Sequence, residues 1–74
     1  MGARFHAGQQ VHWAWGANTA EGRVAEVFAR RVSRTLDGKR VVRNGTADNP
    51  AVLVEQDDGG RVLKRASELH SGGK

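Results

Sequence analysis

The stretch GRVAEVFARRVSRTLDGKRVVR, residues 22–43, decides between a helical and an all-β fold for this chain of 74 residues. Its apolar residues recur at spacings of three, one, four and four, as on one face of an amphipathic helix: Val24, Val27, Phe28, Val32 and Leu36. Three of them are valines, which have low helix propensity. Asp37-Gly38 also lies between β-branched flanks, as in a type I′ hairpin turn. The residues alone leave helix and strand equally open here.

Outside this stretch, turn-forming residues cut the chain into pieces of strand length with β-branched residues inside them. These residues are Gly8, Gly16, Gly22, Asn44-Gly45, Pro50 and Gly59-Gly60, together with Asp37-Gly38. Turn-forming residues at such regular intervals predict a small all-β barrel.

The first of these pieces carries both tryptophans of the chain. Val11, Trp13 and Trp15 alternate with His12 and Ala14, so a strand places the three large side chains on one face. We expect that face to be core, with His12 toward solvent. Trp15, next to Gly16 at the strand end, is the tryptophan that we expect to be partly exposed.

The C-terminal part has the pattern of two further strands. AVLVEQ, residues 51–56, is an apolar run that follows Pro50, a residue that can open a strand but not occupy its middle. DDGG then turns the chain, and RVLKRASEL follows with Val62 and Leu63 on opposite faces of a regular strand. Residues 67–69 form a short closing turn, from which Leu69 docks on the core.

Length and composition limit the classes of protein that this chain can represent. A chain of 74 residues makes one domain, residues 1–70, followed by a flexible tail, residues 71–74. A core of this size supplies about 3–5 kcal/mol, which disfavours an enzyme with a walled pocket. The absence of cysteine excludes disulfides and thiolate zinc sites. With no apolar run of signal-peptide or membrane-spanning length, we expect a soluble, cytoplasmic protein without a cofactor.

Positive charge is concentrated in one segment. Residues 23–43 carry +5, whereas the whole chain carries +4. The candidate contact residues for a polyanion or an acidic partner are Arg23, Arg30, Arg31, Arg34, Lys39, Arg40 and Arg43, with Trp15 as a stacking residue. Most of them flank the turn at residues 37–38, so we expect them to converge in space. The alternative is that this segment is simply the most solvated part of a small soluble domain.

The order and spacing of many residues resemble the hypervirulence-associated Tudor-like domain family, small domains of bacteria and fungi without an assigned activity. The matching residues run from Phe5 to Leu69: Phe5, Gly8, Val11, Trp13, Gly22, Val24, Gly38, Asp48, Pro50, Val54, Lys64, Ser67 and Leu69. The resemblance implies an SH3-like, Tudor-type barrel of about five antiparallel strands, with residues 22–34 as one long strand leading into the hairpin. It therefore favours strand over helix for the central stretch.

The sequence departs from the family pattern at two places. Gln9 stands where the family often has an acidic residue, and Val52 and Leu53 stand where it commonly has an aromatic one. These departures affect any shared ligand surface more than they affect the fold.

A methyl-lysine cage, which the name Tudor suggests, needs about three or four converging rings. The chain has four aromatic residues, Phe5, Trp13, Trp15 and Phe28, and the core needs at least two of them. Catalysis and metal binding are equally disfavoured, because the three histidines lack ligand spacing and DDGG lacks the spaced oxygens of a calcium loop. We expect no enzyme activity, no metal and no small-molecule substrate.

Two binding functions remain. Arginines along a hairpin, with an exposed tryptophan, can hold DNA or RNA by contacting phosphates and stacking on a base. Alternatively, open strand edges and the same positive charge can serve a protein interaction module that docks an acidic protein. Either module is expected to be a monomer or a weak homodimer.

Overall fold

The computed structural model describes residues 5–36 and 38–71. Along the chain the elements are β1 (Gln10–Trp15), β2 (Asn18–Phe28), β3 (Arg31–Leu36), β4 (Lys39–Asn44), β5 (Ala51–Gln56), β6 (Arg61–Arg65), the 3-10 helix η1 (Ala66–Glu68) and β7 (His70–Ser71). Asp37 of the expected turn and residues 72–74 of the expected tail lie outside the described residues.

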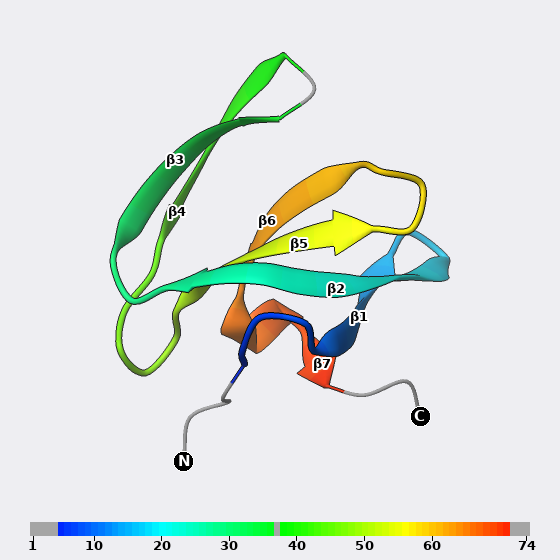
Figure 1. Cartoon of the computed structure of the whole chain (residues 1–74), viewed down its shortest axis with the longest axis horizontal. Helices are drawn as coiled ribbons and strands as arrows, with labels where there is room; N and C mark the ends of the chain where they lie inside the picture. The colour runs from blue at the N-terminus through cyan, green and yellow to red at the C-terminus, as the bar shows by residue number, and fades with distance from the viewer. Residues whose placement is uncertain (1–4, 37, 72–74) are drawn as a thin grey trace.

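The strands form two separate antiparallel sheets (Figure 1). The larger sheet has the order β6-β5-β2-β1-β7, and β3 pairs only with β4. The fold is therefore all-β, as predicted. The expected barrel of about five strands is wrong in two respects: the described part of the chain contains six strands of five or more residues plus the two-residue β7, and the sheets do not close into a barrel.

The central stretch is strand, so the helical alternative is wrong. It is also not one long strand over residues 22–34, because the chain bends at residues 29–30 between β2 and β3. The helix-like spacing has a physical cause in β2, whose pairing with β5 shifts by a bulge between Val24 and Glu26. A bulge inserts one extra residue and changes the phase of the alternation. Val24 and Phe28 therefore belong to different core clusters despite their even separation.

Strand β5 divides the core in two, because four successive residues, 51–54, are buried. Val52 and Val54 belong to the first core, which also contains Val11, Trp13, Val24, Ala66 and Leu69. Ala51 and Leu53 belong to the hairpin core, which also contains Phe28, Val32 and Leu63. The hairpin core lies between the sheet and the β3–β4 hairpin. The expected opposite orientation of Val62 and Leu63 is confirmed, since they pack on the first core and the hairpin core respectively.

The two tryptophans have different environments. Trp13 is 2% exposed in the first core, whereas Trp15 is 66% exposed in the last residue pair of the β1–β2 ladder, opposite Asn18. The expectation that Trp15 is the accessible tryptophan is confirmed. His12 is half-buried rather than fully solvent-facing, and its ring stacks on that of His70 with centroids 5.2 Å apart.

The connection between β4 and β5 packs tightly against β2 and the C-terminal turn. The Gly45 N–H donates to the Arg30 carbonyl at 3.1 Å. Asn49 accepts from the Ser67 N–H at 2.8 Å through Oδ1 and donates to the Ser67 hydroxyl at 3.1 Å. The predicted closing turn is confirmed as η1, and Leu69 is buried in the first core.

Replacing Trp13 with alanine is expected to lower the free energy of unfolding by about 3–5 kcal/mol, because the ring fills the first core. Trp15→Ala is expected to cost less than about 1 kcal/mol, since that ring is mostly in solvent. Because this loss is comparable with the whole stability expected of so small a domain, Trp13→Ala should show little or no cooperative urea transition, whereas Trp15→Ala should keep one close to that of the unmodified protein. Comparable losses would show that the Trp15 ring contributes to the core.

Position 45 requires glycine because the backbone of two other segments passes too close to it for a side chain. A Cβ at this position would lie 2.5 Å from both the Ala51 nitrogen and the Phe28 carbonyl oxygen. Gly45→Ala is therefore expected to cost about 2–3 kcal/mol of stability in thermal or urea denaturation. Gly16→Ala is the control, because a Cβ at Gly16 would have no atom within 4 Å, and its φ of +59° adds only backbone strain of about 1 kcal/mol. Equal losses would contradict the steric explanation.

Candidate ligand-binding surface

The β3–β4 hairpin carries most of the predicted contact residues. Leu36 pairs with Lys39 across a two-residue turn, and Gly38 has the positive φ of +77° that such a turn requires. Figure 1 shows the hairpin extending away from the five-stranded sheet, and the nearest strand of that sheet is β6. The hairpin contacts the sheet along one of its faces, where Leu36 and Val41 pack on the hairpin core.

The register distributes the basic residues over two faces, because directly opposite residues of an antiparallel pair share a face. The inner face, toward the sheet, comprises Val32, Arg34, Leu36, Lys39, Val41 and Arg43. The outer face comprises Arg31, Ser33, Thr35, Arg40, Val42 and Asn44. Val32 is buried, and Leu36 and Val41 pack on the hairpin core, which identifies the inner face. The expected convergence on one surface is therefore only partial.

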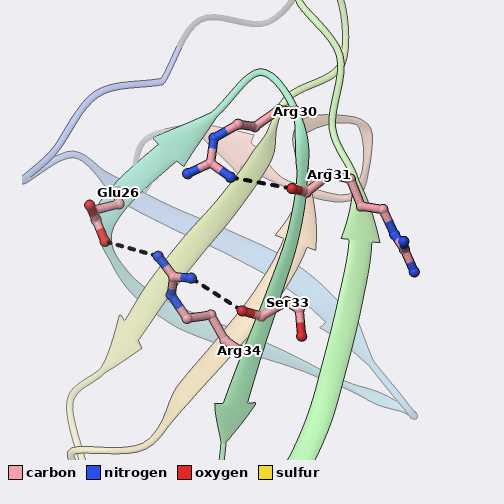
Figure 2. Close-up of polar contacts among 5 residues, drawn as sticks. All are labelled: Glu26, Arg30, Arg31, Ser33 and Arg34. Atoms are coloured by element: carbon pink, nitrogen blue, oxygen red, sulfur yellow. Dashed lines mark hydrogen bonds and ion pairs between the residues drawn. The ribbon is translucent and has the colours of Figure 1, made fainter.

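Two arginines are engaged at the base of the hairpin (Figure 2). The guanidinium carbons of Arg30 and Arg34 lie 5.3 and 5.0 Å from the centroid of the Phe28 ring. Arg34 also pairs with Glu26 at 3.9 Å and donates to the Ser33 carbonyl at 3.1 Å, as Figure 2 shows. These contacts fix the two side chains against the sheet. Their first role is to position the hairpin.

The outer face has a shallow hollow of about 310 Å³ lined by Arg31, Ser33, Arg40 and Val42. Both arginines are exposed, and the serine hydroxyl adds a hydrogen-bond donor between them. No acidic residue of the described part of the chain contributes to this lining. The hollow therefore offers fixed positive charge and donors to an anion arriving from solvent.

A groove of about 280 Å³ separates the inner face of the hairpin from β6. The groove is lined by the apolar residues Leu36, Val41, Val62 and Leu63 and by the cationic residues Lys39, Arg43, Arg61 and Lys64. Val62 and Lys64 border it at the edge of β6, because their side chains lie on the opposite face from Leu63. Arg43 is partly buried and donates to the Val42 carbonyl at 2.8 Å. Within residues 5–36 and 38–71, this groove combines apolar surface with four positive charges and no acidic lining residue.

Sequence reasoning missed Arg61 and Lys64. They lie outside the basic segment, in a region whose acidic residues balance the charge count. The cue in the sequence is the odd spacing of the two basic residues in RVLK, which predicts a strand with one basic residue on each face. Only the packing of β6 against β4 brings them to the groove.

Two predicted contact residues lie away from the hairpin. Arg23 lies in β2, where it is opposite Gln10 on one side and Glu55 on the other. Trp15 lies beside the N-terminal end of β2, whereas the hairpin follows its C-terminal end, and the 11 residues of β2 span about 30 Å. Trp15 and the basic hairpin therefore do not form one continuous surface.

The four aromatic side chains do not converge as a methyl-lysine cage requires. Phe5 and Trp13 pack in the first core, Phe28 lies beneath two arginines in the hairpin core, and Trp15 is exposed at the end of β1. Within residues 5–36 and 38–71 there is no group of three or more metal-ligating side chains. The part of the chain that the structure describes also contains no helix with the length and apolarity needed to cross a bilayer.

The family model for the TUDOR domain of hypervirulence-associated proteins matches residues 8–69 of this chain. The chain therefore belongs to this family, as the sequence resemblance indicated. No curated protein and no solved structure matches it. Membership in a Tudor-type family defines the class as a small binding module, and it does not identify a partner.

Phe28→Leu is expected to cost about 1–2 kcal/mol, because leucine retains apolar contact but removes the ring beneath Arg30 and Arg34. Amide hydrogen exchange should also accelerate in β3 and β4 more than in β1. Glu26→Gln is the control, since an exposed ion pair contributes less than about 1 kcal/mol. Unchanged exchange in the hairpin would show that the ring contacts do not hold it.

Proposed function

We propose that this chain is a small, non-catalytic binding module with an SH3-like arrangement of strands, and that its β3–β4 hairpin binds single-stranded nucleic acid. The observation that carries this proposal is the outer-face hollow, where Arg31 and Arg40 flank the Ser33 hydroxyl on an exposed surface. Guanidinium and hydroxyl groups are suited to phosphate oxygens.

The open shape of the hairpin supports an extended ligand. The hollow is shallow, and strands β3 and β4 extend away from the five-stranded sheet (Figure 1), so a nucleic-acid strand can lie across the hollow without being enclosed. A duplex reader would instead need an element inserted into a groove to reach base edges. Contacts to phosphates alone imply binding with little sequence preference.

In this proposal, Trp15 contributes to the binding of longer ligands only. Its separation of about 30 Å from the hairpin, along β2, exceeds the reach of a few nucleotides. We expect an oligothymidylate of about four nucleotides to shift hairpin amides without changing tryptophan emission, and one of about fifteen to quench it. Because Trp13 is buried, the quenched fluorophore is Trp15, and Trp15→Ala removes the response.

Replacing Arg31 and Arg40 together with alanine is expected to weaken oligothymidylate binding and to reduce its salt dependence. Each lost phosphate contact lowers the slope of log K against log salt by about 0.7, so the pair lowers it by about 1.4. The matched control is Arg23→Ala with Arg65→Ala, two exposed arginines outside the hairpin. Fluorescence anisotropy at several salt concentrations measures both. Equal slopes for the two double variants would contradict the placement of the site on the hairpin.

A further inference from the structure

Strand β6 is at the edge of the five-stranded sheet and is paired on one side only, with β5. In an antiparallel ladder, every second residue pair is joined by backbone hydrogen bonds. The Gln56 N–H donates to the Gly60 carbonyl at one end of this ladder, and the Ala66 N–H donates to the Pro50 carbonyl at the other. These two bonds fix which residues of β6 face β5.

By this alternation, the backbone N–H and C=O groups of Val62 and Lys64 point toward β5, where these two residues lie opposite Val54 and Val52. The N–H and C=O groups of Arg61 and Leu63 therefore point to the open edge of the sheet, whereas the Arg65 N–H already donates to Glu68 Oε1 at 3.0 Å. Unpaired edges of this kind are templates for another strand, and proteins usually cover them.

The open edge of β6 borders the groove under the inner face of the hairpin. Residues 61–64 line one side of that groove, and the hairpin lines the other with Leu36, Val41, Lys39 and Arg43. An extended segment in the groove thus meets unpaired backbone groups, apolar side chains and positive charge together. This combination is what recognition by strand addition requires: backbone hydrogen bonds for affinity and alternate side-chain contacts for specificity.

We propose that the groove takes an extended acidic segment of a partner protein, which adds as a strand to the edge of β6. Charge complementarity selects this occupant, because four of the lining residues are cationic and, among the residues that the structure describes, none is acidic. A second copy of this chain, with a net charge of +4, is a poor match. The five residues of β6 accommodate a segment of about 17 Å.

The first test is a titration of the isotope-labelled protein with a capped heptapeptide of alternating glutamate and valine. We expect the amide protons of Arg61 and Leu63 to exchange with solvent at least tenfold more slowly in the complex, since they gain acceptors. The amides of Val62 and Lys64, already paired with β5, should change little. A heptapeptide with lysine in place of glutamate should not bind. Binding without protection at Arg61 and Leu63 would overturn strand addition.

Two N-methylated peptides test the backbone contacts on the unmodified protein. One carries methyl groups on the odd-numbered amides and the other on the even-numbered amides, so only one set removes the donors that face β6. We expect one peptide to lose binding at least tenfold and the other to retain it. Equal affinities would show that charge alone drives association, which would also overturn the proposal.

Charge-reversal variants locate the peptide on the inner face. Lys39→Glu and Lys64→Glu are each expected to weaken the acidic peptide at least tenfold. Arg40→Glu is the matched control, since it makes the same charge change one residue along β4 but on the outer face. Amide spectra of each variant verify that the fold is retained. Equal weakening by Lys39→Glu and Arg40→Glu would place the peptide elsewhere.

Nucleic acid and a second copy of the chain are the two other candidate occupants of the groove, and each would give a different experimental result. Displacement of the peptide by an oligothymidylate that protects the same amides would make the groove a phosphate site and overturn the proposal. Self-association without peptide, seen by sedimentation and abolished by Lys64→Glu, would make a second copy the occupant and overturn it as well. Arg31→Ala with Arg40→Ala weakens nucleic acid but not the peptide, so the two binding proposals succeed or fail separately.

Discussion

The burial of β5 on both faces is the constraint on which the rest of this structure depends. A domain of this size has little apolar surface to bury, and four consecutive residues of one strand serve two cores at once. Val52 and Val54 stabilise the sheet against β1, η1 and Leu69, whereas Ala51 and Leu53 hold the hairpin through Phe28, Val32 and Leu63. The hairpin is separate in its hydrogen bonding, but its position depends on this shared strand.

The sequence predicted the parts of the fold that local pattern controls. Alternation in residues 11–15 identified β1 and its buried face, and turn residues located most strand ends. It did not predict the two-sheet arrangement, because a strand buried on both faces has no alternation to reveal which neighbours cover it. The bulge at Val24/Glu26 had a similar effect, since a shift of phase within β2 imitates helical periodicity.

The candidate site could be predicted only in part for a related reason. Charge clustering located the hairpin, because its two strands are adjacent in sequence. Which arginines lie on which face depends on the strand register, and a shift of one residue would move each of them to the opposite face. Arg61 and Lys64 reach the groove through contact between β6 and β4, strands about 20 residues apart, and no local pattern encodes that contact.

Charge also explains why the two sheets remain separate beside this groove. Closing the fold by pairing β4 with β6 would bring the inner-face cations Lys39 and Arg43 close to Arg61, and like charges opposite one another destabilise a strand pair. The apolar residues on both sides favour approach, while the cations oppose full closure. An anionic strand between them would remove the repulsion and satisfy the open edge of β6 together. In the proposed complex, the cations that oppose closure of the fold are therefore also the groups that select an acidic ligand.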